Sequence, residues 1–216
     1  MTETEYTLLT RLGELLRNAI RQSWARAVAQ HADEHIYAYV LYTEPLLGYA
    51  VPSFNSEEAL ARIAGDEDER EELRWSPPDW EYHLENKQLF DKVQSVLEEL
   101  DVQRDYDDDT VWERRWRVFI DSLLDLDHDS LFGTGEVRNA LTVNIMWGDQ
   151  DLVSHVQSAR ELNPKESYLR FARAQLDWLH DWQAEIDGRR SAYKEEAITR
   201  IKGAIDMVIK DMQLDG

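Results

Sequence analysis

Apolar residues recur at spacings of three and four along much of the chain, the pattern of helices that bury one face. The first stretch, residues 6–30, places Leu8, Leu12, Leu15, Ala19 and Val28 at this spacing, with arginines between them. Similar stripes predict helices over residues 55–64, 86–100, 111–126 and 149–162, the last capped by Asp149. Beyond Asn163-Pro164 the pattern stays helical, with a break near Gly188.

Three other segments have the character of β-strands. Residues 36–42 are rich in aromatic and branched side chains, which is typical of a strand covered on both faces. Residues 47–51 are predicted to form a second strand that ends at Pro52, and the short connection favours an antiparallel pair. In residues 141–147 an alternating pattern predicts a half-buried strand, with Leu141, Val143, Ile145 and Trp147 on one face and Thr142, Asn144 and Met146 on the other.

The order of these elements predicts the fold class. It reads helix, two strands, helices, strand, helices, and this lacks the strand–helix alternation of a doubly wound parallel sheet. We predict an α+β fold, with an antiparallel sheet of three or more strands and helices packed on it. Residues 1–187 are expected to form a single domain, and residues 188–216 a helical C-terminal extension packed on that domain.

The composition supports a core that needs no covalent links. Of 216 residues 43% are hydrophobic, and the chain has no cysteine, which excludes disulfides and thiolate metal sites. The acidic start of the chain is unlike a secretory signal, and no apolar run approaches the ~20 residues that cross a bilayer. We therefore expect a cytoplasmic protein, without a cofactor.

The net charge of −20 bears on possible partners. Such a chain is repelled by phosphate backbones and by anionic lipid headgroups, so neither nucleic acid nor membrane is expected to bind it. Residues 57–72 carry −6 and residues 98–129 carry −8, whereas residues 157–216 are nearly neutral. The charge has two interpretations: it serves solubility alone, or it attracts a protein partner with a basic surface.

Two kinds of residue are candidates for contact with a partner. Acidic clusters supply the first kind. The second lies beside Pro77-Pro78, where a rigid turn could display aromatic side chains, although aromatic residues at such spacing are more often core. The candidate partner-binding residues are Asp66, Glu67, Asp68, Glu69, Trp75, Trp80, Asp107, Asp108 and Asp109.

One segment has the spacing of a calcium-binding loop. Asp125, Asp127 and Asp129 occupy its first, third and fifth positions, and Glu136 its twelfth. Ser130 stands where the loop requires glycine, and a strand follows in place of the exiting helix. We therefore predict an ordinary helix end with Asp125 and Asp129 one turn apart, Asp127 pointing elsewhere and no bound metal.

Other signs of chemistry are weak. His31 and His35 have the four-residue spacing of zinc ligands on a helix, but no third ligand is evident, so we interpret the pair as structural or solvent-exposed. The sequence contains no nucleophile elbow, no phosphate-binding loop, no dinucleotide fingerprint and no cysteine nucleophile. Among 44 acidic residues, coincidental carboxylate pairs are inevitable and identify no site.

Three stretches together resemble the bacterial family known as domain of unknown function 4303. They are residues 37–43 before residues 55–60, residues 74–82 with the pattern Arg-Trp-Ser-Pro-x-x-Trp-x-Tyr, and Leu131-Phe132-Gly133 before the strand ending at Trp147 and the triplet Leu162-Asn163-Pro164. The resemblance covers about residues 5–175. It implies an α+β fold and brings no catalytic or ligand residues. Families of this kind often sit beside bacterial toxin genes, so the resemblance also implies an immunity role by association.

Two classes of function follow from these observations. The leading hypothesis is a non-enzymatic binding protein, in its specific form an immunity protein that neutralises a toxin with a basic surface. A DNA mimic is a variant that requires carboxylates spaced like phosphates along one face. The alternative is an enzyme that uses acidic residues, with or without a divalent cation, and it requires carboxylates that converge in a cleft.

Overall fold

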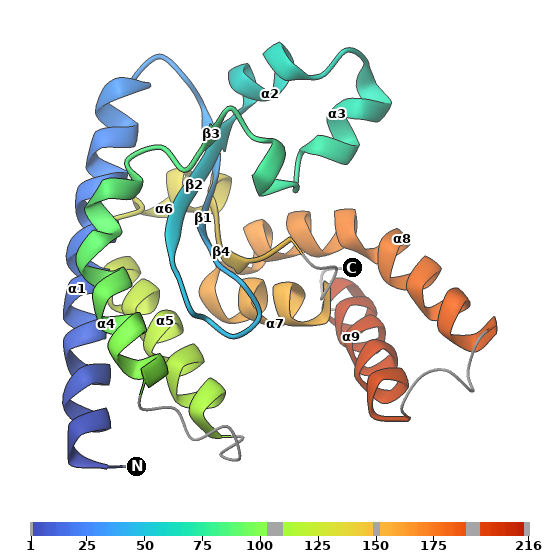
Figure 1. Cartoon of the computed structure of the whole chain (residues 1–216). Helices are drawn as coiled ribbons and strands as arrows, with labels where there is room; N and C mark the ends of the chain where they lie inside the picture. The colour runs from blue at the N-terminus through green and yellow to red at the C-terminus, as the bar shows by residue number, and fades with distance from the viewer. Residues whose placement is uncertain (1, 103–109, 149–151, 189–194, 214–216) are drawn as a thin grey trace.

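The computed structural model describes residues 2–102, 110–148, 152–188 and 195–213 (Figure 1). The helices of the first half are α1 (Glu3–Gln30), α2 (Glu57–Ile63), α3 (Glu67–Leu73), η1 (Pro77–Asp79), η2 (Lys87–Phe90) and α4 (Asp91–Val102). Those of the second half are α5 (Thr110–His128), α6 (Gly135–Ala140), α7 (Leu152–Leu162), α8 (Lys165–Gly188) and α9 (Glu195–Gln213). The strands are β1 (Ile36–Tyr42), β2 (Val51–Ser56), β3 (Tyr82–His83) and β4 (Thr142–Met146).

The strands form one mixed sheet in the order β3-β2-β1-β4. β2 runs antiparallel to both β1 and β3, whereas β4 runs parallel to β1, with Ala38 opposite Thr142. The α+β class is confirmed, but the sheet is not antiparallel throughout as predicted. The connection from β2 to β4 contains β3 and the helices α2 to α6. It is long enough to bring the chain back to the end of the sheet at which β1 begins, so β4 can run in the same direction as β1.

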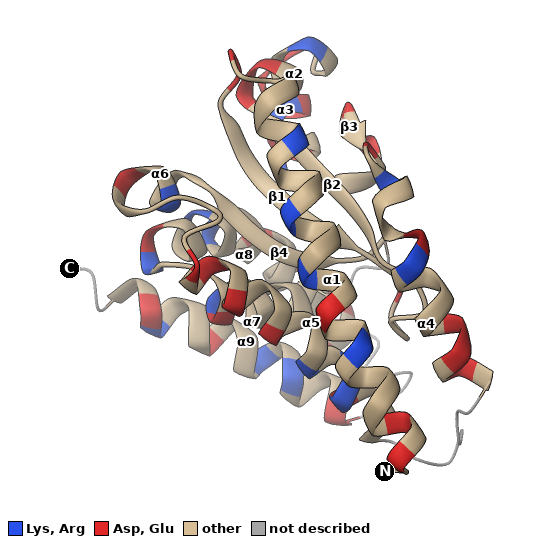
Figure 2. Cartoon of the chain, turned by 90° about the vertical axis from the view of Figure 1, so that its left-hand side faces the viewer, with Lys and Arg blue, Asp and Glu red and all other residues tan. Residues whose placement is uncertain are grey.

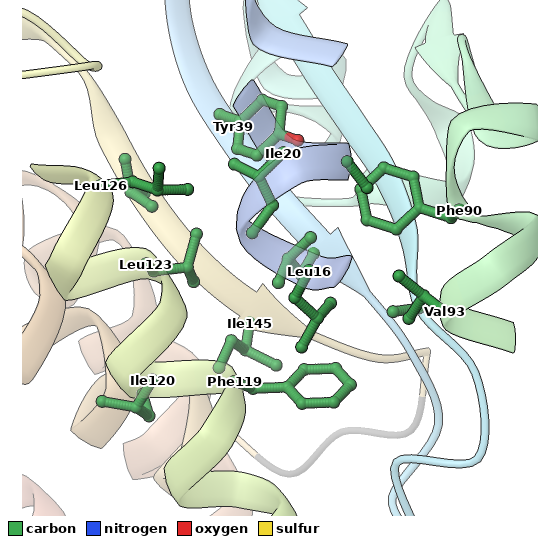
Figure 3. Packing of buried hydrophobic residues seen from close by; sticks show 14 of the residues in the cluster. Leu16, Ile20, Tyr39, Phe90, Val93, Phe119, Ile120, Leu123, Leu126 and Ile145 are labelled. Atoms are coloured by element: carbon green, nitrogen blue, oxygen red, sulfur yellow. The ribbon is translucent and has the colours of Figure 1, made fainter. Parts of the chain in front are cut away.

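The sheet separates two hydrophobic cores. Along β1, Tyr39 and Leu41 belong to the first core, while Ala38 and Val40 belong to the second, as the two-residue period of a strand requires. Residues of α1, α4 and α5 fill the first core (Figure 3). Residues of α7, α8 and α9 fill the second, on the other side of the sheet (Figure 1). The molecule is therefore a sandwich of three layers.

β4 is buried on both faces and not on one as predicted. All five of its residues are buried, because α5 covers one face and α7 and α8 cover the other. Its polar residues are tolerated there because they are hydrogen-bonded. Asn144 donates to the carbonyl of His155 over 3.1 Å and accepts from Ser158 over 2.6 Å.

The second strand begins later than predicted. Residues 47–50 lie outside the sheet, and β2 starts at Val51 and includes Pro52, which pairs with Leu41. Proline is tolerated because β3 is paired only with Ser53 and Phe54, so Pro52 stands where β2 has a single neighbouring strand. Ser56 caps α2 by accepting a hydrogen bond from the amide of Ala59 over 2.9 Å.

The C-terminal helices pack onto the rest of the chain. α8 ends at Gly188, where the break was predicted, and α9 buries Ile201, Ile205 and Val208 in the second core. Asp149, the predicted cap of α7, lies outside the described residues. None of the helices in the described part of the chain is long and apolar enough to span a membrane.

Candidate partner-binding surface

The acidic arm, which we define as residues 66–73, consists of α3 and its capping residue. Asp66 begins the helix by accepting a hydrogen bond from the amide of Glu69 over 2.9 Å. α3 has no fully buried residue, only Leu73 at its end packs against the second core, and the helix projects beyond the sheet (Figure 1). The candidates Asp66, Glu67, Asp68 and Glu69 are therefore together and exposed, in the company of Glu71 and Glu72.

The base of the arm is held by charged groups that face the protein. Glu57, the first residue of α2, accepts two hydrogen bonds from Arg74, each 2.8 Å, and one from Arg70 over 3.0 Å. The hydrogen bonds from Arg74 are the main reason that the pKa of Glu57 lies below its usual value. Arg70 is the only basic residue of α3, and its engagement with Glu57 leaves the outer side of the arm purely anionic.

Trp75 and Trp80 lie in the core beneath the arm, which corrects the interpretation of their turn as a display of aromatic side chains. Trp75 is 8% exposed and Trp80 3%. The Trp75 indole meets the rings of Tyr37 and Phe171 edge-on, with centroid distances of 5.6 and 5.0 Å. The indole nitrogen of Trp80 donates to the carbonyl of Leu73, the last residue of α3, over 3.1 Å. The hydrogen bond from Trp80 therefore ties the end of α3 to the core, whereas the indole nitrogen of Trp75 is buried without a hydrogen-bond partner among the described residues.

The second acidic region differs from the arm. Asp107, Asp108 and Asp109 lie outside the described residues. Several carboxylates of the region that the structure does describe are paired with arginines, in the pairs Asp101–Arg115, Asp121–Arg117, Asp125–Arg17, Asp127–Arg138 and Asp129–Arg21. By contrast Glu67, Asp68, Glu71 and Glu72 of the arm make no ion pair within the described residues. The arm is thus a concentration of uncompensated charge.

The segment with calcium-loop spacing is a helix end, as predicted. Asp125 and Asp129 both face α1, where they pair with Arg17 at 3.2 Å and Arg21 at 2.9 Å. Asp127 points elsewhere, to Arg138 at 2.6 Å. Glu136 belongs to the next helix, α6, and its side chain is exposed, so a short helix follows this segment before β4, and not directly the strand that was expected. Throughout the described ranges, no three histidine or acidic side chains gather closely enough to hold a metal ion.

The loop after α1 is fastened by polar contacts that sequence analysis missed. His31 pairs with Glu85 at 3.1 Å and His35 with Glu58 at 2.6 Å, so the two histidines point to different carboxylates and do not share a metal site. Between them, Glu34 accepts hydrogen bonds from Ser56, Tyr82 and Arg62. Burial opposes ionisation of Glu34, but these hydrogen bonds prevail and lower its pKa. Partners so far away in sequence leave no local signal.

Arg138 of α6 joins the ends of two other helices, α5 and α7. Its guanidinium donates to Asp127, to the carbonyls of Leu141 and Leu162 at 2.8 Å, and to the side chain of Asn163 at 3.3 Å. Arg138 thereby ties the last turn of α5 and the end of α7 to Leu141, the residue before β4.

Comparisons with known proteins locate the family. The model of a family described as a domain of unknown function, DUF4303, matches residues 16–164. No curated protein and no solved structure matches the chain. The match includes the whole sheet, the arm and α7, and it stops before α8 and α9.

Proposed function

The chain belongs to the family described as domain of unknown function DUF4303, and we propose that it is a non-enzymatic protein that binds a partner with a basic surface. The acidic arm carries this proposal. Within α3 only Leu73 packs against the core, and the base of the helix is anchored by Arg70, Arg74 and Glu57, while the carboxylates of Glu67, Asp68, Glu71 and Glu72 are exposed. A rigid, uncompensated anionic surface is suited to a cationic partner.

The physical consequence is fast association. Long-range attraction between the arm and a basic surface raises the rate of encounter, and salt screens this attraction over a Debye length of ~8–10 Å. Anchoring the arm at its base reduces the conformational entropy that binding must remove. We place the partner among bacterial toxins with a basic surface, met in the cytoplasm, so that the protein would act as an immunity protein.

The test is capture of the partner with matched variants. In the arm variant Glu67→Gln, Asp68→Asn, Glu71→Gln and Glu72→Gln replace four exposed carboxylates. The control variant removes the same charge from α8 and α9, with Asp177→Asn, Asp181→Asn, Glu196→Gln and Asp206→Asn at exposed positions. Pull-down from the native host at low and moderate salt then identifies partners that depend on the arm.

We expect the captured protein to be basic and its association rate, measured by surface plasmon resonance, to fall about tenfold or more in the arm variant at low salt. The control variant should lose less than about threefold, because its substitutions lie in the nearly neutral part of the chain. Equal capture by the two variants, or no partner at either salt concentration, would contradict the proposal.

A further inference from the structure

Close to the base of the arm the surface contains a hollow of about 160 Å³, lined mainly by apolar side chains. Trp24 and Val28 of α1 form one wall, and Phe132 and Val137 form another. Both views show α6 beside the C-terminal half of α1 (Figures 1 and 2). Glu34 lies at the edge of the hollow and accepts a hydrogen bond from Ser56, which caps α2. The hollow and the arm are therefore at the same end of the sheet.

The walls of the hollow combine rigidity with exposed apolar surface. The Trp24 indole donates to the carbonyl of Leu131 over 2.9 Å and packs edge-on against Phe132 at 5.5 Å, so its ring is fixed. Val28 and Val137 are 45% and 68% exposed, and both line this one hollow. Large apolar side chains that gather at a rigid depression are typical of the anchor points of protein interfaces.

The volume limits what can enter. An apolar cavity of about 150 Å³ holds a molecule the size of benzene. A hollow of about 160 Å³ therefore has room for one side chain of the size of leucine or phenylalanine, and not for a helix or a cofactor.

The charges near the hollow favour a partner side chain that has basic residues beside it. Asp33 precedes Glu34, and Glu136 precedes Val137, and both are exposed carboxylates with no ion pair among the described residues. The negative charge of Glu34 itself is offset by Arg62 at 2.9 Å. Arg26 is exposed but lies about half a turn around α1 from Trp24 and Val28, because successive helical residues are rotated by about 100°. Among the described residues next in sequence to the lining, the charges without an ion pair are therefore carboxylates.

We propose that this hollow receives a single leucine- or phenylalanine-sized side chain from a lysine- or arginine-bearing segment of a partner protein. The proposal rests on the proposed function and names the contact that follows electrostatic encounter. The arm accelerates association, while burial of one apolar side chain in a preformed hollow slows dissociation.

Two synthetic peptides of equal charge test the proposal, acetyl-Lys-Lys-Leu-Lys-Lys-amide and its counterpart with serine in place of leucine. Binding is followed by NMR of the full chain with labelled valine methyl groups. We expect the leucine peptide to shift the methyl signals of Val28 and Val137 and to bind about tenfold more tightly than the serine peptide.

Variants of the hollow complete the design. Ala32→Phe fills it from an exposed position in its lining, and Ala29→Phe, also exposed but outside the lining, is the control. Ala32→Phe should reduce the preference for leucine to about one while the affinity for the serine peptide and the melting temperature stay unchanged; Ala29→Phe should keep the preference. Val137→Ser, at a largely exposed position, should also abolish the preference without unfolding the protein.

The outcomes separate this proposal from the role of the arm. The arm variant should reduce the affinity for both peptides by the same factor. The ratio of the two affinities therefore tests the hollow even if the arm plays no part in binding. Equal binding of the two peptides, a preference that survives Ala32→Phe, or no detectable binding of the leucine peptide at millimolar concentration would overturn the hollow as an anchor site.

Discussion

Asn163 shows how one side chain can complete the edge of a sheet. β4 is an edge strand, and the Asn163 amide replaces the neighbour that it lacks. The side-chain oxygen accepts from the amide of Val143 over 2.8 Å, and the side-chain nitrogen donates to the carbonyl of the same residue over 2.7 Å. This pairing closes the edge to other strands and joins it to the end of α7.

Replacing Asn163 with alanine should therefore destabilise the protein strongly. The change leaves the amide and carbonyl of Val143 buried without partners, and each such group costs about 1–3 kcal/mol. We expect the free energy of unfolding, measured by urea denaturation, to fall by about 3 kcal/mol. Asn139→Ala is the matched control, since among the described residues its side chain bonds only to the exposed Glu166. A loss of less than about 1 kcal/mol in Asn163→Ala would refute the edge role.

At the scale of elements, glycines occur in two different settings. Gly133 lies in the turn between α5 and α6 with φ +92°, and a Cβ atom built there would come within 2.8 Å of Val137. Gly203 lies within α9, and a Cβ atom there would meet no atom within 4 Å. The first position requires glycine, and the second does not.

The same substitution should thus have opposite effects at these two positions. Gly133→Ala places a side chain on a backbone that is left-handed, and the new Cβ atom must displace Val137. We therefore expect the free energy of unfolding to fall by about 1–3 kcal/mol. Gly203→Ala removes the flexibility of glycine from a helix, and we expect a gain of up to about 1 kcal/mol. Thermal denaturation of both variants measures these changes. A higher melting temperature for Gly133→Ala would contradict the close packing of the turn.

Besides its apolar contacts, α9 is joined to α7 and α8 through the carboxylate of Asp211. Asp211 is buried, and it accepts hydrogen bonds from Arg160 over 2.6 Å and from Tyr168 over 3.1 Å. The hydrogen bond from Arg160 is the main cause that lowers the pKa of Asp211, against an opposing effect of burial. A lowered pKa means that the carboxylate stabilises the fold above its unfolded pKa of ~3.9, and that this stability is lost as the pH falls through the folded value.

Asp211→Asn should consequently reduce the free energy of unfolding by about 1–2 kcal/mol at pH 7. The difference from the wild-type protein should shrink as the pH is lowered below ~4, because the wild-type carboxyl then takes up its proton. Urea midpoints between pH 7 and pH 3 measure this convergence. Asp206→Asn, at an exposed position of the same helix, is the control and should show no such trend. A difference that is constant with pH would argue against Asp211 as the group responsible.

For the whole molecule, the central feature is that the sheet needs a cover on each face. The family match ends at residue 164, yet the second core includes residues of α8 and α9 beyond that point. Phe171 and Leu179 of α8 are buried there together with Val40 of β1. α8 therefore supplies part of the cover of the second face.

Two truncated chains should therefore behave differently. A chain ending at residue 164 lacks α8 and α9, and we expect no cooperative unfolding and strong binding of the dye ANS, which reports exposed apolar surface. A chain ending at residue 188 keeps α8 and should unfold cooperatively at a lower melting temperature. Calorimetry compares the two, and a cooperative transition in the shorter chain would show that α8 is dispensable.

Local sequence determined the elements whose patterns lie within a single stretch of chain. The strand over residues 36–42 coincides with β1, and the first predicted helix, residues 6–30, has the same end as α1. The helix end at Asp125–Asp129 was also readable, because Ser130 departs from the calcium-loop pattern. The α+β class and the anionic character of the arm followed from the same kind of information, periodicity and charge.

Only the tertiary structure determined which of these segments contact one another. The direction of β4, the second cover of the sheet and the burial of Trp75 and Trp80 depend on contacts between distant segments. Asp125 and Arg17 are 108 residues apart, and only their pairing distinguishes a neutralised carboxylate from the free ones of the arm. The hollow between α1 and α6 arises in the same way. Periodicity and composition record what each segment prefers, whereas the choice of partner is made by packing, which brings together residues that share no local pattern.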